Sequence, residues 1–200
     1  MEDYQDAPES TLVVALQQED AAAFEYFVRT FGGRALAVAR RYLRNSDDAE
    51  DCIQDAFLQA FRNIEKFEQR SSLATWLHRI VVNSALMKLR SQTRLAEQSI
   101  DDLLPQFDTG ECRVEPSWRF DESVETLAAK GEARRHVRDA IDSLPENYRI
   151  VLLLRDIEEY RTDETAELMD MTPGSVKITL HRARSALKKK LEPLFERDGE

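Results

Sequence analysis

The chain has 200 residues, of which 42% are hydrophobic, enough for one large domain or two small ones with buried cores. No apolar run approaches the ~20 residues that span a membrane, and the acidic first residues lack a signal sequence, so we expect a cytoplasmic protein. Cys52 and Cys112 belong to no paired motif and the three histidines complete no metal spacing, which predicts reduced thiols, no metal site and no cofactor.

The net charge of −10 is unevenly distributed along the chain. Residues 29–94 carry a net charge of +5 and residues 173–200 of +3. Residues 1–28, 95–132 and 133–172 carry −7, −7 and −4. Two basic blocks with an acidic one between them suggest two modules that face nucleic acid and a connector.

Residues 1–9 are expected to be a loose tail, and residues 10–43 to be helical with one buried apolar face. The predicted inward residues are Leu12, Val13, Leu16, Ala23, Phe24, Phe27, Val28, Phe31, Leu36, Ala39, Tyr42 and Leu43. The predicted outward residues are Arg34, Arg40, Arg41 and Arg44. Gly32 and Gly33 either interrupt this helical path or bend it gently.

A second helix is expected from Asp48 to about Ile64. Residues 45–48 are a helix start signal, in which Asp47 and Glu50 have the spacing of a capping box. The predicted buried face contains Ile53, Phe57, Ala60, Phe61 and Ile64. The opposite face is either simply solvated or docks a basic partner, and it contains Glu50, Asp51, Gln54, Asp55, Leu58 and Gln59.

A third helix is expected to follow a loop at residues 67–72, starting from a cap at Ser71 or Ser72 and ending near Arg90. Its apolar stripe is formed by Leu73, Trp76, Leu77, Ile80 and Val81. Its mixed polar face is formed by Thr75, Arg79, Asn83, Leu86 and Arg90. By residue type alone, Trp76 is a core residue and Asn83 a surface amide.

Residues 95–131 match no motif and are predicted to be a largely unfolded acidic linker, interrupted by Pro105, Gly110 and Pro116. We expect its apolar residues to pack locally on a partner: Ile100, Leu103, Leu104, Phe107, Trp118 and Phe120. Two supporting helices are expected next, at residues 132–143 and 145–156. The first is predicted to have half-buried residues at His136, Val137, Ala140 and Ile141, and the second inward residues at Tyr148, Val151, Leu152 and Leu154.

Residues 162–191 have the pattern of a helix-turn-helix. Thr162 is expected to cap a short helix, Asp170 to adopt a left-handed turn conformation, and Thr172 to cap a second helix that begins with Pro173. The second helix has an apolar stripe at Val176, Leu180, Ala183 and Leu187. Residues 173–191 contain six lysines or arginines and no acid. A basic run alone is usually a solvated face, but in this context we interpret it as a DNA-recognition helix.

Residues 48–67, DAEDCIQDAFLQAFRNIEKF, and residues 71–90, SSLATWLHRIVVNSALMKLR, resemble region 2 of bacterial RNA polymerase sigma factors, in particular the compact extracytoplasmic-function (ECF) group. Residues 141–191, which include IDSLPENYR and GSVKITLHRAR, resemble region 4 of that group. The resemblance implies an all-α fold of two small helical domains. Region 2 would span residues 10–94, a flexible acidic linker residues 95–131, and region 4 residues 132–195.

The resemblance also implies a promoter-specificity subunit that recruits core RNA polymerase, helps to melt promoter DNA and often serves a stress response. The acidic helix face would bind the clamp of the largest polymerase subunit through Asp51, Gln54, Asp55 and Leu58. Region 4 would also contact the flap of the second-largest subunit. An anti-sigma factor commonly covers these surfaces.

The DNA contacts that the resemblance implies fall into two groups. The minus-ten element would be bound by Phe67, Arg70, Ser71, Trp76, Arg79, Asn83, Lys88 and Arg90. The loop at residues 67–72 would capture a flipped base, and Asn83 would help to read the element. Trp76 would either contact DNA at the fork between duplex and single strands or belong to the core. The minus-thirty-five element would be bound by Ser175, Lys177, Ile178, Thr179, His181, Arg182 and Arg184.

The sequence departs from the family pattern near the helix-turn-helix. Glu159 occupies a position usually given to glycine, Arg161 one given to a capping serine, and Thr165 one given to an aliphatic residue. Ile178 and Thr179 stand where polar or basic residues usually face DNA. An exposed Ile178 would suit a thymine methyl group, so the readout of the minus-thirty-five element is expected to be specific to this chain.

Two other classes of protein remain open. A stand-alone helix-turn-helix regulator usually binds paired half-sites as a dimer, and we find no dimerising heptad pattern. An enzyme would need a phosphate loop, a His/Cys cluster or a nucleophile motif, and the sequence has none, so we expect no catalytic residues. Co-purification with core RNA polymerase separates the three classes.

Overall fold

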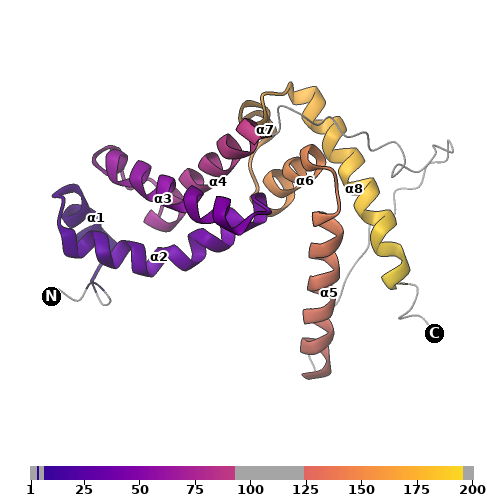
Figure 1. The fold of residues 1–200 in the computed structure, drawn as a ribbon, viewed down its shortest axis with the longest axis horizontal. Helices are drawn as coiled ribbons and strands as arrows, with labels where there is room; N and C mark the ends of the chain where they lie inside the picture. Colours follow the sequence, from indigo (N-terminus) through magenta and orange to yellow (C-terminus); the bar gives the residue numbers. More distant parts are fainter. Residues whose placement is uncertain (1–3, 5–6, 93–123, 196–200) are drawn as a thin grey trace. The chain divides into compact units, whose positions relative to one another are not determined.

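The computed structural model describes residue 4, residues 7–92 and residues 124–195, which fall into two compact units divided after Ala96 (Figure 1). Every regular element in these ranges is a helix, which confirms the all-α fold predicted from the sequence. No helix in the described ranges is long and apolar enough to cross a membrane. The predictions for residues 95–123, including the linker's apolar residues, lie outside the described residues.

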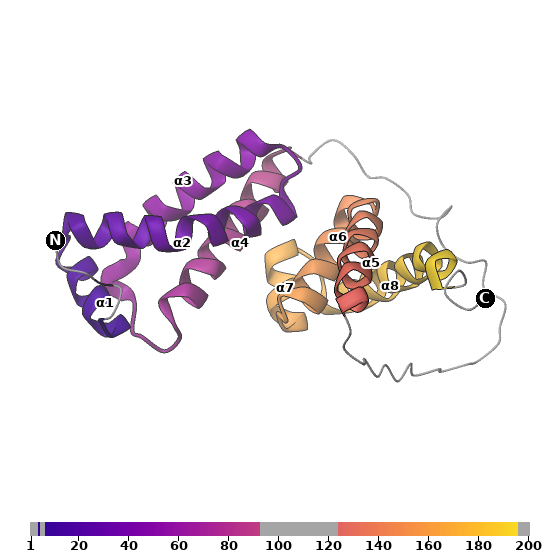
Figure 2. The ribbon, with the colours of Figure 1, turned by 90° about the horizontal axis from the view of Figure 1, so that it is seen from below.

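The N-terminal unit contains α1 (Glu9–Gln17), α2 (Ala21–Tyr42), α3 (Ser46–Asn63), the 3-10 turn η1 (Ile64–Lys66) and α4 (Leu73–Gln92). Helices α2, α3 and α4 each pack on the other two, and α1 packs on α2 and η1 (Figure 2). The largest fully buried side chains of this unit include Leu16, Phe27, Tyr42, Leu73 and Val81. Burying each such side chain contributes about 1.5–3 kcal/mol, so this cluster holds the four helices together.

The predicted helical stretch at residues 10–43 consists of two helices. The chain breaks before α2, whose first turn is capped by the Asp20 carboxylate accepting a hydrogen bond from the Ala23 N–H at 2.8 Å. Helix α2 then continues through Gly32 and Gly33, so these glycines do not interrupt it. Val28, predicted to point inward, is exposed.

Helix α3 begins earlier than predicted. The side chain of Asn45 accepts a hydrogen bond from the Asp47 N–H at 2.9 Å, so Asn45 is the cap and the predicted capping box of Asp47 and Glu50 is wrong. At the start of α4 the Ser72 hydroxyl accepts from the Thr75 N–H at 3.1 Å, which selects Ser72 from the two predicted caps.

The C-terminal unit contains α5 (Val124–Asp142), α6 (Glu146–Leu152), one π-helical turn η3 (Leu153–Ile157), α7 (Thr162–Met169) and α8 (Pro173–Phe195). Helix α8 packs against α5, α6 and α7. The core of the helix-turn-helix is formed by Val151, Ala166, Val176 and Leu180. Helix α5 begins before the predicted residue 132, and His136, predicted to be half-buried, is exposed.

Helix α7 is capped one residue earlier than predicted. Arg161 is the N-cap residue, and its backbone N–H donates to the Glu164 carboxylate at 2.7 Å, so Thr162 is the first helical residue rather than the cap. Just before it, Glu159 has a φ of 57°. This left-handed conformation agrees with the prediction that Glu159 occupies a position suited to glycine.

The turn of the helix-turn-helix agrees with the sequence pattern. Asp170 has a φ of 54°, the left-handed conformation predicted for it, and the Met171 N–H donates to the Ala166 carbonyl at 2.9 Å to close the turn. The Thr172 hydroxyl then accepts from the Ser175 N–H at 3.1 Å. Thr172 is therefore the cap of α8, as predicted.

The two threonines at the starts of α7 and α8 provide a matched test of these caps. We expect Thr172→Ala to lower the free energy of unfolding of the C-terminal unit by about 1 kcal/mol, because the first turn of α8 loses its side-chain acceptor. Thr162→Ala should change this free energy much less, since Glu164 supplies the acceptor at α7. Urea unfolding of the full chain, followed by circular dichroism, measures both values. Equal losses in the two variants would contradict the assignment.

Candidate functional site

Helix α3 has one buried face and one exposed face, and packing of the buried face fixes which residues are exposed. The inner side carries small residues, Ala49, Cys52, Ala56 and Ala60, which are buried against the neighbouring helices. The outer side leaves the four predicted polymerase-contact residues exposed: Asp51, Gln54, Asp55 and Leu58. Leu58 is one of the few large apolar side chains of the described residues that are exposed to water. The face therefore combines two carboxylates, an amide and an apolar side chain.

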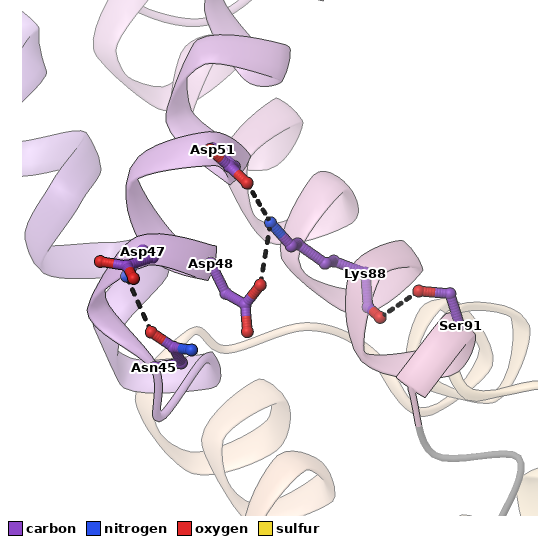
Figure 3. Close-up of polar contacts among 6 residues, drawn as sticks. All are labelled: Asn45, Asp47, Asp48, Asp51, Lys88 and Ser91. Carbon is purple, nitrogen blue, oxygen red and sulfur yellow. Dashed lines mark hydrogen bonds and ion pairs between the residues drawn. The ribbon is translucent and has the colours of Figure 1, made fainter.

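Lys88 joins this face to α4. Its ammonium nitrogen lies 3.1 Å from a carboxylate oxygen of Asp48 and 3.1 Å from one of Asp51, as Figure 3 shows. Partial burial acts to lower the pKa of Lys88, but the hydrogen bonds and charges of the two carboxylates raise it above its usual value. The sequence assigned Lys88 to DNA phosphates, whereas the structure places it in an ion-pair network within the protein.

The outer side of α4 carries an exposed stripe at spacings of three and four residues. The predicted residues Thr75, Arg79, Asn83 and Arg90 are all exposed on it. Leu86, predicted to lie on the same face, is buried, and the position is taken by Met87, which is 65% exposed. Sequence reasoning missed Met87, although its spacing of four from Asn83 could have identified it.

Of the residues near the loop before α4 that are predicted to contact the minus-ten element, some are buried and others are exposed. Phe67 is only 6% exposed, and its ring centroid lies 5.0 Å from that of Trp76, so Phe67 is a core residue rather than a surface contact. Trp76 is half-buried. Arg70 and Ser71 are exposed, and Arg70 forms a 2.7 Å ion pair with Glu68.

Helix α8 buries one stripe and exposes the rest of its surface. Val176, Leu180 and Ala183 are buried, as predicted. Lys177, Ile178, His181 and Arg182 are exposed, and Ser175 and Thr179 are half-buried. Ile178 is 58% exposed, as predicted for a residue on the outer face of this helix.

Arg184 differs from the other predicted contacts of α8. Its guanidinium forms two hydrogen bonds with the carboxylate of Asp156, at 2.6 and 2.9 Å, and thereby links α8 to η3. The hydrogen bonds and charge of Asp156 raise the pKa of Arg184, although partial burial opposes this. In this structure Arg184 therefore ties α8 to η3, and its contact with DNA stays a prediction.

Cys52 lies between α3 and α4, where its thiol donates to the Val81 carbonyl at 3.9 Å. Burial raises the pKa of Cys52 to about 11, so the thiol stays protonated at neutral pH and is a poor nucleophile. Cys112 lies outside the described residues. Among the described His, Cys, Asp and Glu residues, no group is arranged to hold a metal ion.

A helix-turn-helix whose second helix has no acid at residues 173–191 is typical of a helical DNA-binding protein. Comparison with known proteins is more specific: residues 27–95 match the family "Sigma-70 region 2" and residues 134–187 match "Sigma-70, region 4". The chain is 33% identical to the ECF RNA polymerase sigma-E factor of Escherichia coli K12 over 191 residues, covering 94% of this chain and 97% of the relative. Identity to the sigma-E factor of Haemophilus influenzae is 32% over 187 residues, with the same coverage.

The chain therefore belongs to the ECF group of the sigma-70 family, the RNA polymerase sigma factors that act in transcription initiation. Among solved structures, it is 21% identical to CnrH in complex with the cytosolic domain of CnrY, with a TM-score of 0.49. That comparison covers 92% of this chain and 97% of the other.

Proposed function

We propose that this sigma factor recruits core RNA polymerase to promoters that carry a minus-ten and a minus-thirty-five element, and that it promotes melting of the first. It acts in the cytoplasm, often in a stress response, and has no catalytic activity of its own. Family membership supports this proposal, and so does one structural observation. Each unit has an exposed polar helix face, on α4 and on α8, whose orientation is fixed by a buried apolar stripe on the same helix.

The exposed face of α3 is the proposed contact with the clamp of the largest polymerase subunit. Asp51 and Asp55 give this face negative charge. Gln54 adds an amide, and Leu58 adds an apolar side chain. Such a face suits a basic partner surface, because complementary charge steers association and fixes register. Region 4 is proposed to contact the flap of the second-largest subunit.

The outer side of α4, with the loop before it, is the proposed contact with the minus-ten element. Arg79 and Arg90 are exposed cations for phosphates, and Asn83 lies between them along the helix. Arg70, which is exposed and ion-paired with Glu68, and exposed Ser71 are proposed to contact an unpaired base, and half-buried Trp76 offers a ring on which a base can stack. Phe67, whose ring packs on that of Trp76, is proposed to support the tryptophan rather than to contact DNA.

The recognition helix α8 is the proposed contact with the minus-thirty-five element. Lys177, His181 and Arg182 are exposed and polar, and Ile178 is exposed and apolar. Ser175 and Thr179 lie at the edge of this surface, half-buried. An anti-sigma factor that covers these surfaces is proposed as the regulator, on the basis of family membership.

Asn83→Ala tests the proposed role in promoter opening. We expect fewer open complexes on duplex promoters, because Asn83 would no longer hydrogen-bond to an unpaired base. A promoter with a pre-melted bubble should partly rescue the variant, since strand separation no longer has to be driven. Permanganate footprinting measures the opening.

The matched control for this experiment is Asn147→Ala, which removes an exposed amide from the other unit. It should open duplex promoters as the unmodified chain does. Footprints of Asn83→Ala that equal those of the unmodified chain on duplex DNA would make Asn83 a simple surface amide.

A further inference from the structure

Helix α1 contacts both ends of the loop that the proposed function assigns to an unpaired base, residues 67–72. This loop follows η1 and precedes α4, and α1 packs on η1. Two side chains of α1, one at each end of the helix, form hydrogen bonds with the backbone on either side of the loop. One helix therefore connects the start of the loop to its end.

Gln17 holds the backbone just before the loop. Its side-chain amide donates to the Ile64 carbonyl at 3.2 Å, across 47 positions of the chain. The same carbonyl accepts a second hydrogen bond from the Phe67 N–H at 3.0 Å. The point at which the chain leaves η1 and enters the loop is therefore tied to α1.

Glu9 holds the backbone at the other end of the loop. Its carboxylate accepts a hydrogen bond from the Leu73 N–H at 2.9 Å, across 64 positions of the chain. Leu73 is the first residue of α4, and the N–H groups of a first turn have no acceptor within their own helix. The Ser72 hydroxyl already accepts from the Thr75 N–H, so Glu9 and Ser72 satisfy two different donors. A negative charge at this end of a helix is also favourable to the helix dipole.

Helix α1 is itself fixed by packing. Leu12, Val13 and Leu16 lie between its two hydrogen-bonding residues and are buried. The loop, in contrast, contains Gln69 with a φ of 54°, a left-handed conformation that non-glycine residues rarely adopt. Local backbone preference therefore does not favour this loop shape, and the packed helix supplies two fixed points for it.

We propose that Glu9 and Gln17, here called the loop brace, are positioning residues for base capture, which hold residues 67–72 in the shape that receives an unpaired base. The inference rests on the proposed function, because it takes this loop as a DNA contact. A loop that is already ordered in the free chain loses less conformational entropy when DNA binds. The brace therefore raises affinity for unpaired DNA without contacting it.

Glu9→Ala and Glu9→Gln separate the hydrogen bond from the charge. Both variants lose one negative charge and so gain equally in long-range attraction to DNA, but the glutamine carbonyl can still accept from the Leu73 N–H. Amide hydrogen exchange of the free full chain measures the loop directly. Residues 67–75 should exchange at least about threefold faster in Glu9→Ala than in Glu9→Gln, with no change in α2 and α3, because only the loop opens more often. Faster exchange throughout the N-terminal unit would instead mean that Glu9 only stabilises the fold.

Binding to unpaired DNA is measured by anisotropy with a fluorescein-labelled single strand, which carries the minus-ten sequence selected with the unmodified chain from a random library. Glu9→Ala should bind this strand about three- to tenfold more weakly than Glu9→Gln, as expected for one hydrogen bond. The salt dependence should be the same in both, because the brace makes no phosphate contact. Gln17→Ala should also bind more weakly than its matched control Gln18→Ala, which removes the neighbouring exposed amide.

The two assays distinguish a failure of the brace from a failure of the proposed function. Equal exchange of residues 67–75 in Glu9→Ala and Glu9→Gln, or equal affinities of these two variants for the strand, would overturn the proposal. A strand with abasic sites in place of the minus-ten bases tests base capture itself. If the unmodified chain binds both strands equally while the difference in exchange persists, the brace holds the loop and the proposed base contact is wrong.

Discussion

Replacement of Gln54 by alanine together with Asp55 by arginine is expected to abolish association with core RNA polymerase while α3 stays folded. Both side chains are exposed on the outer side of α3 and make no contribution to the unit's core. A reversed charge in a desolvated contact with a basic surface costs several kcal/mol, which corresponds to a loss of affinity of at least about 100-fold. Co-purification with core enzyme measures the association, and circular dichroism measures helicity.

The control for this experiment is Glu65→Arg. It makes the same reversal of charge at an exposed residue of the same unit, in η1 and outside the proposed interface. It should reduce polymerase binding only slightly. If the double variant has native helicity and still co-purifies with core enzyme like the unmodified chain, α3 does not provide the polymerase contact.

Arg182→Ala is expected to lower transcription from the chain's own promoters about 5- to 150-fold, because a good guanidinium contact with a base contributes about 1–3 kcal/mol. Ile178→Ser should leave overall activity closer to normal and relax the preference at one base pair, where the isoleucine would pack on a thymine methyl. Selection of promoters from a randomised minus-thirty-five element with each variant measures both effects.

Lys189→Ala is the matched control on the same helix, since it removes an exposed cation beyond the proposed recognition residues. It should weaken transcription slightly and to the same extent at every promoter sequence, because only the attraction of one cation to the DNA phosphates is lost. If Ile178→Ser changes the preference at no position, the surface of α8 that reads DNA lies elsewhere on the helix.

The helix-turn-helix could be predicted in detail because its signals are local. A threonine before Pro173, a turn residue at Asp170 and an apolar period of three to four residues are all properties of neighbouring side chains. The same kind of signal is ambiguous where several candidates adjoin one another. Four polar residues adjoin one another at the start of α3, at positions 45–48, and only the folded backbone shows that Asn45, rather than Asp47, accepts the hydrogen bond of the first turn.

The positions of Leu86 and Met87 show a second limit. Residues three and four positions from Asn83 lie on nearly the same side of a helix, so periodicity alone cannot decide which of the two is buried. Packing of α4 against α2 and α3 decides it, because Leu86 enters the core and Met87 remains in solvent. The sequence pattern therefore placed the stripe correctly but not each of its members.

Ion pairs between distant residues could not be predicted from the sequence. Lys88 and Asp51 are 37 positions apart, and Arg184 and Asp156 are 28 apart, so both contacts depend on how helices pack. Both pairs involve basic residues, Lys88 and Arg184, that the resemblance predicts to contact DNA. Phe67 was misplaced for a related reason: a phenylalanine in a loop looks accessible until its ring packs on Trp76.

Transcription in vitro with purified core RNA polymerase, the purified full chain and a library of randomised promoters tests the central claim most directly. The proposed function predicts transcripts that depend on the added chain and that arise from promoters sharing two elements, a minus-thirty-five and a minus-ten. If the chain gives no transcription above that of core enzyme alone, or if the selected promoters share no such pair of elements, the proposed function is wrong.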